Sequence, residues 1–195
     1  MTGILRSGRL SASRVFAILV AIQSLLIAFG CPAESTAESE SLAAWGQIVQ
    51  VLRHPRCLNC HQLEQPLQGD SRRVHIPPVV RGPDNLGAGT MRCYNCHNDR
   101  NNEMARVPGA PNWSLAPASM LWEGKSDAEL CELIKTPALY HDRFPDALLQ
   151  HFTEDHVVLW AWHPGAGRAP IPVSHDDFVG LVKIWVAGGL ACLNS

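Results

Sequence analysis

Two short stretches of the chain carry the same set of chemically reactive residues. The first is CLNCH, from Cys57 to His61, and the second is CYNCH, from Cys93 to His97, which begins 36 positions later. Two cysteines separated by two residues can bind zinc, exchange a disulfide or attach a haem covalently. These stretches therefore define the candidate site, and the three chemistries have to be compared.

Each of the three chemistries would use these residues differently. For zinc, the four cysteines would supply four thiolates to one tetrahedral ion, and the histidines would have no role. A disulfide-exchange pair usually lies in a thioredoxin-like βαβ unit, which neither stretch resembles. For haem, the cysteines would form thioethers, and His61 and His97 would bind iron as proximal ligands. The cysteines concerned are Cys57, Cys60, Cys93 and Cys96. Covalent haem is favoured because it uses every one of these residues.

The first thirty residues have the composition of an export signal. Three arginines and no acid lie in or before the apolar run VFAILVAIQSLLIAFG, residues 15–30, and a small, polar and acidic stretch follows it. This order predicts a secretory signal peptide over residues 1–30, with an uncleaved membrane anchor as the alternative. Cys31 stands where a bacterial lipoprotein is cleaved and acylated, so a lipid anchor at Cys31 is a further hypothesis.

The rest of the chain is expected to form a polar linker, residues 31–40, and a single domain, residues 41–195. Without residues 1–30 the chain keeps 13 basic and 18 acidic residues, so its net charge changes from −2 to −5. This acidic balance argues against nucleic acid as a partner. Cys131 and Cys192 are left over, and in an oxidising compartment we expect them to form a disulfide, with two buried free thiols as the alternative.

Helices are expected on both sides of an irregular middle. Ser41 is predicted to cap a helix that stops before Pro55 and leads into Cys57. Residues 62–92 and 98–118 contain too much proline and glycine for regular elements, and no hairpin is predicted there. Later helix starts are predicted at Ser126, Pro145, Thr153 and Ser174. The predicted fold class is mainly α: a compact cytochrome c-like domain whose long ordered loops surround two covalently bound haems.

The two stretches, together with the leader, resemble the diheme c-type cytochromes. The resemblance implies a periplasmic electron carrier, or the electron-transfer subunit of a larger oxidoreductase, with two covalently attached haem c groups. The layout departs from tandem modules, because two complete cytochrome c modules cannot fit when their motifs are 36 positions apart. The two haems are therefore expected to share one domain and to lie close together.

Several longer stretches are similar to a group of small bacterial proteins named as subunits of isoquinoline 1-oxidoreductase, a molybdenum hydroxylase. They are RGPDNLGAGTMRCYNCHNDRN, GAPNWSLAP, ELCELIK and VLWAWHPGAGR, and the similarity covers about residues 55–193. This resemblance implies that the protein carries electrons from a catalytic subunit towards a respiratory chain. The expected partners are redox proteins, with a molybdenum hydroxylase catalytic subunit as one candidate.

The second axial ligand of each iron would set its potential. A methionine ligand raises the potential, a second histidine lowers it, and an open position admits an external ligand. His75 lies in a loop stiffened by IPP, His151 lies on a predicted helix, and Met120 lies in the stretch PASMLWEG. His75, His151 and Met120 are therefore the candidate distal ligands. His54 and Met91 lie so near their own cysteine pairs that reaching the opposite face of the same haem would be awkward, but they could serve the other haem.

Four function classes follow from these residues. The favoured one is electron transfer without catalysis, and its alternative is a haem enzyme of the peroxidase type with one open iron. A sensor and a zinc-binding protein are more remote. Six arginines near the second stretch are candidates to pair with haem propionates, although a solvated basic face is the alternative. They are Arg72, Arg73, Arg81, Arg92, Arg100 and Arg106.

Overall fold

The computed structural model of the chain describes residues 33–140 and 143–193. By its internal contacts the chain divides into residues 1–36 and residues 37–195, and the candidate site belongs to the second unit. The predicted signal peptide and Cys31 lie outside the described residues. Among the helices that are described, none combines the length and the apolar composition needed to cross a membrane.

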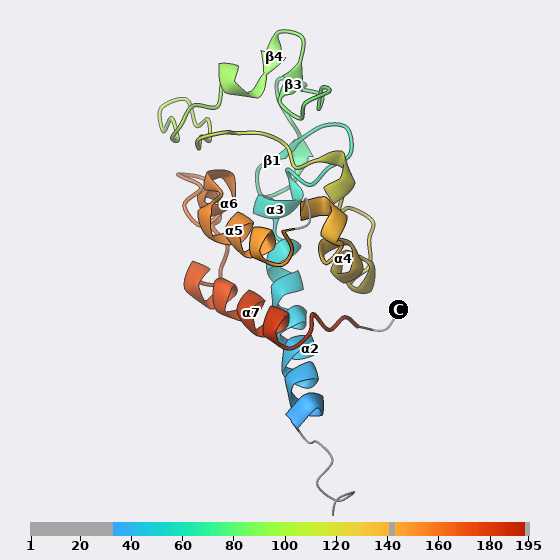
Figure 1. The fold of residues 1–195 in the computed structure, drawn as a ribbon. Helices are drawn as coiled ribbons and strands as arrows, with labels where there is room; N and C mark the ends of the chain where they lie inside the picture. Colours follow the sequence, from blue (N-terminus) through green and yellow to red (C-terminus); the bar gives the residue numbers. More distant parts are fainter. Residues whose placement is uncertain (1–32, 141–142, 194–195) are drawn as a thin grey trace, which may run out of the picture. The chain divides into compact units, whose positions relative to one another are not determined.

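A frame of helices forms the core of the second unit. Its helices are α2 (Ala33–Leu52), α4 (Asp127–Ile134), α5 (Asp146–Glu154), α6 (His156–Trp160) and α7 (His175–Ala187). Figure 1 shows α4, α5 and α7 grouped beside α2, and buried apolar side chains of all four helices form one cluster. Trp45 of α2 and Trp185 of α7 are buried, and their ring centroids are 5.0 Å apart. The predicted mainly helical fold is confirmed.

The start of α2 differs from the prediction. The helix begins at Ala33, so most of the expected linker 31–40 is helical and Ser41 is not its cap. The alanines and glutamates of this stretch favour a helix, and acids stabilise a helix N-terminus. Ser41 is fully buried, donates its hydroxyl to the Trp185 carbonyl at 2.9 Å and accepts from the Ala191 amide at 3.1 Å. Ser41 therefore joins α2 to the end of α7.

The later helices mostly begin where the sequence predicted. The capping box at Ser126 and the cap at Ser174 are confirmed by bonds to the first turns of α4 and α7. The expected start at Thr153 is wrong, because α5 continues through that residue. Instead, the Asp155 carboxylate accepts from the Val157 amide at 2.9 Å and caps α6. An aspartate is as good a cap as a threonine, so the sequence alone did not separate the two.

The middle of the chain is mostly irregular, as predicted, but it contains two antiparallel pairs. β1 (Leu67–Gln68) pairs with β2 (Arg73–Val74), and β3 (Gly87–Ala88) pairs with β4 (Met91–Arg92). The expectation of no hairpin is therefore wrong. Gly87 has a φ of +85°, and a Cβ there would lie 2.2 Å from the Met91 carbonyl oxygen. Strands of two residues are too short for an alternating pattern to reveal them.

The predicted disulfide between Cys131 and Cys192 is present, with a Cα separation of 5.7 Å. It joins α4 to the segment after α7 across 61 residues of chain. Replacing both cysteines by serine should lower the free energy of unfolding by about 4 kcal/mol, because the unfolded chain regains the entropy of an open loop. Guanidinium unfolding of the two forms measures this difference. Equal stability of the oxidised protein and the double variant would contradict it.

Candidate functional site

Both CxxCH stretches adopt the same kind of local structure, a single helical turn. The first turn overlaps the end of α3 (Pro55–Leu58). The amides of Cys60 and His61 both donate to the Cys57 carbonyl at 3.2 Å. The second follows η1 (Cys93–Asn95), where the amides of Cys96 and His97 donate to the Cys93 carbonyl at 3.2 and 2.9 Å. Such a turn brings both cysteines and the histidine of one stretch close together.

His54 has a structural role at the start of α3. Its Nδ1 accepts from the Arg56 amide at 3.2 Å and so caps the helix that carries Cys57. Burial lowers the pKa of His54, and the neighbouring guanidinium of Arg56 lowers it further. A neutral His54 is needed because a protonated Nδ1 cannot accept this bond.

Acid should therefore weaken this cap. The folded pKa of His54 lies below its ordinary value of 6.5, so near and below pH 6.5 the unfolded chain binds more protons than the folded chain. The free energy of unfolding should fall as the pH falls from 7 to 5, and it should fall less over this range in His54→Asn, whose amide oxygen does not titrate. Thermal unfolding at several pH values measures both proteins. Identical pH profiles would contradict the prediction.

A cavity of about 560 Å³ lies beside the first stretch. Cys57, Cys60 and His61 line it, and the candidate distal ligands His151 and Met120 line it as well. This volume is in the range of sites that bind organic ligands of cofactor size. The first stretch thus has its own cavity, which holds two of the three distal candidates.

A second cavity of about 510 Å³ lies beside the second stretch. Cys93, Cys96 and His97 line it together with the third distal candidate, His75. Four residues line both cavities, which places the cavities next to each other in the same unit. They are Arg56, Cys60, Ser114 and Leu115. Adjacent cavities match the expectation that two cofactors share one domain.

The two motif histidines are oriented in the same way by backbone carbonyls. Nδ1 of His61 lies 2.8 Å from the Met120 carbonyl oxygen, and Nδ1 of His97 lies 2.7 Å from the Pro108 carbonyl oxygen. A carbonyl only accepts, so in each ring Nδ1 carries the proton and Nε2 keeps its lone pair. Metal-binding histidines are usually held in this manner by their second nitrogen. Both rings are therefore prepared to bind a metal through Nε2.

A tryptophan ring stacks on each of the two histidine rings. His61 stacks on Trp122 with ring centroids 3.4 Å apart and an angle of 15° between the planes. His97 stacks on Trp113 with centroids 4.6 Å apart and an angle of 6°. The two tryptophans therefore help to fix the orientation of the histidine rings.

Burial keeps the first stretch uncharged. It lowers the pKa of His61 to about 3, so the imidazole is neutral and free to bind a metal at neutral pH. It raises the pKa of Cys57 to about 12 and that of Cys60 to about 11. Disulfide exchange needs a thiolate, which this environment disfavours. A zinc ion would itself deprotonate a thiol that binds it, so these pKa values bear on disulfide exchange alone. A thioether carries no charge, so the buried position suits a covalently attached haem.

The arrangement of the cysteines does not suit a shared zinc ion. The two pairs line different cavities, and only Cys60 contributes to both. In residues 33–140 and 143–193, no group of three or more His, Cys, Asp and Glu side chains could hold a metal ion. A haem does not need three or more protein ligands, because the porphyrin supplies four nitrogens and the protein adds one or two axial ligands. Two cysteines and one histidine at each cavity are the residues that a covalently attached haem would use.

His75 faces His97 across the second cavity. Their ring centroids are 6.0 Å apart, with an angle of 61° between the planes. Both rings line the same cavity, so both could contribute a nitrogen to one metal bound there. Nδ1 of His75 lies 2.8 Å from the Pro77 carbonyl oxygen, so its Nε2 is also free. His75 is thus well placed as a distal ligand.

His151 suits the distal position of the first cavity better than Met120 does. Nδ1 of His151 lies 3.3 Å from a carboxylate oxygen of Asp155, which leaves Nε2 available. The Met120 carbonyl accepts from Nδ1 of His61, the nitrogen that points away from a metal on Nε2. The backbone of Met120 therefore lies on the Nδ1 side of the His61 ring. Asp155 was not singled out from the sequence, because an aspartate four residues from a histidine is a common pattern on helices.

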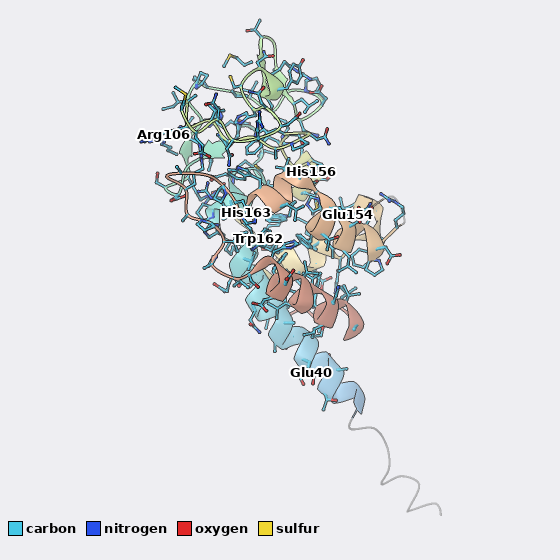
Figure 2. All side chains as sticks on the ribbon, turned by 90° about the vertical axis from the view of Figure 1, so that its left-hand side faces the viewer. Glu40, Arg106, Glu154, His156, Trp162 and His163 are labelled. Carbon is cyan, nitrogen blue, oxygen red and sulfur yellow. A yellow bond between two sulfur atoms is a disulfide. The ribbon has the colours of Figure 1, made fainter. Side chains whose placement is uncertain are left out.

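Five arginines line the second cavity, and two of them are paired with carboxylates, Arg56 with Asp70 and Arg92 with Asp84. Of the six arginines expected near haem propionates, Arg73, Arg92 and Arg106 line this cavity, and Arg56 and Arg168 join them. Figure 2 shows Arg106 among the loops of this region. None of the described residues that line the cavity is Asp or Glu.

The other arginines of the predicted cluster have different partners. Arg72 pairs with Glu123 at 3.1 Å, and Arg81 donates to several carbonyl oxygens, so both have structural roles. Arg100 lines neither cavity. The sequence missed Arg56 and Arg168, because only the fold brings the segments around these residues to the second stretch.

Compared with protein-family models, with curated proteins and with solved structures, the chain gives no match.

Proposed function

We propose that the protein is an exported diheme c-type cytochrome that transfers electrons, alone or as the electron-transfer subunit of an oxidoreductase complex. One observation carries the proposal: each CxxCH turn lines its own cavity, and each motif histidine is held at Nδ1 with Nε2 free. Covalent haem is the cofactor that uses both cysteines and this nitrogen.

The residues of the chain have separate tasks in this proposal. Each bound haem would supply one-electron redox chemistry. Cys57 and Cys60 attach one group, and Cys93 and Cys96 attach the other. The backbone carbonyls and the stacked tryptophans orient His61 and His97. The shared wall at Cys60 keeps the two groups near each other, which favours electron transfer between them.

We assign His75 and His151 as the distal ligands, so that each iron is held by two histidines. This assignment rests on the 6.0 Å separation of the His75 and His97 rings and on the bond between His151 and Asp155. Two histidine ligands give a lower potential than a histidine and a methionine. Both irons would then have six ligands, with no position open to oxygen or peroxide.

One observation supports a second candidate function. If His151 does not bind iron, it lies in the first cavity with Asp155 beside it, as an acid–base group of a peroxidase would. That candidate requires an open iron above His61.

Low-temperature electron paramagnetic resonance, with carbon monoxide and peroxide assays, separates the two functions. Electron transfer predicts two low-spin irons that are reversibly reduced, do not bind carbon monoxide and do not turn over peroxide. A high-spin iron that binds carbon monoxide and consumes peroxide would support the peroxidase and contradict the assignment of His151.

The cellular setting follows from the export signal. The leader supports a periplasmic location, where c-type haem is attached, with a lipid on Cys31 or an uncleaved signal as the possible anchors. Redox proteins are the proposed partners, and a molybdenum hydroxylase catalytic subunit is the candidate that the sequence resemblance suggests. Co-purification of the exported protein from membrane and soluble fractions would identify them.

A further inference from the structure

Arg56 is a buried cation that belongs to both cavities. It lies on α3 directly before Cys57, and only 1% of its side-chain surface is exposed. It lines the cavity of the first stretch and also that of the second. A charge in this position is close to both cofactor sites and poorly screened by water.

The guanidinium of Arg56 has a hydrogen bond at one nitrogen, Nη2, but not at its Nε within the described residues. Its Nη2 donates to Asp70, and its Cζ lies 5.8 Å from the centre of the Trp160 ring. Its Nε is buried and has no partner in the described part of the chain. A buried donor without an acceptor is costly, and a guanidinium keeps its charge even when buried. Arg56 therefore has a donor to spare for an anionic acceptor in a cavity.

We propose that Arg56 binds a haem propionate and places one positive charge beside both haems, so that it raises the redox potentials of both together. This inference rests on the proposed function, since it requires two bound haems. A fixed positive charge favours the reduced iron, which carries one charge less than the oxidised iron. Because Arg56 lines both cavities, its charge acts on both irons.

Three matched variants test this proposal. Arg56→Gln removes the shared cation, Arg73→Gln removes a cation from the second cavity alone, and Arg143→Gln removes one from the first cavity alone. A spectroelectrochemical titration that resolves the two haems gives two midpoint potentials for each protein. We expect Arg56→Gln to lower both potentials, and each control to lower only that of the haem whose cavity it lines.

A substitution at Asp70 should shift the two midpoint potentials in the opposite direction. Asp70→Asn keeps the Arg56 guanidinium but removes the carboxylate that partly neutralises it, so both potentials should rise. Arg56→Lys keeps a charge at the site, so both potentials should stay closer to the unmodified values than in Arg56→Gln. If Arg56→Gln does not fold, Asp70→Asn decides the question alone.

The outcomes separate this inference from the proposed function. Suppose that the unmodified protein carries two haems per chain, but that Arg56→Gln or Asp70→Asn shifts only one of the two potentials. This result would overturn the shared role of Arg56 and leave the diheme assignment intact. Absence of haem from the unmodified protein would instead overturn the proposed function. The same shift in both potentials, downward for Arg56→Gln and upward for Asp70→Asn, would support the inference.

Discussion

Replacing Cys93 and Cys96 by serine should remove one covalently bound haem from each chain and leave the other in place. The two serines cannot form thioethers, whereas Cys57 and Cys60 are unchanged and both line the other cavity. The second stretch also lies in the loop-rich part of the unit, so its loss should spare the helical core. Intact mass after denaturation measures the covalent haem, which should fall from two groups to one.

Cys131→Ser with Cys192→Ser is the matched control, because it also removes two cysteines but touches neither CxxCH stretch. This control should keep both haems. Loss of both groups from the Cys93 and Cys96 variant, in a chain that remains folded, would contradict two independent attachment sites. Loss of neither group would contradict attachment at the second stretch.

Replacing His75 by alanine should open the second iron to external ligands. The unmodified protein should bind no carbon monoxide, and the variant should bind one molecule per chain. The reason is that the ring centroids of His75 and His97 are 6.0 Å apart, whereas the side chain of alanine has no atom that could bind a metal. The same variant should convert one low-spin iron to high spin and raise its potential, since a histidine ligand lowers it. Optical and paramagnetic resonance spectra of the reduced and oxidised forms measure these changes.

His163→Ala is the control for this experiment, because His163 is exposed and lines neither cavity. It should leave both irons six-coordinate. His151→Ala should repeat the opening at the first iron. If His75→Ala leaves the spectra unchanged, His75 is not a ligand and the distal assignment of the second site is wrong.

Local patterns predicted much of the helical frame. Ser126 and Ser174 were found because a side-chain cap leaves a signal within four residues. The pairing of Cys131 with Cys192 followed from counting cysteines in an exported chain. Ser41 was misassigned because its bonds are to Trp185 and Ala191, about 150 positions away, and no local pattern records them.

The sequence singled out the residues of the candidate site but not its surroundings. The CxxCH spacing pointed to the cysteines and to His61 and His97, and the structure places His75 and His151 in separate cavities with them. The groups that orient the histidines could not be predicted, because the acceptors are the backbone carbonyls of Met120 and Pro108, which any residue has. Arg56 was missed since its importance arises from the junction of two cavities, which only the folded chain creates.

A pyridine haemochrome assay on the denatured, exported protein tests the central claim most directly. The chain should be produced with its own leader in a host that matures c-type cytochromes, purified, and analysed for covalent haem and for metals. We predict two covalently bound haems per chain and no stoichiometric zinc. Protein that is exported and folded but carries no covalent haem, or that carries zinc on its four motif cysteines, would contradict the account.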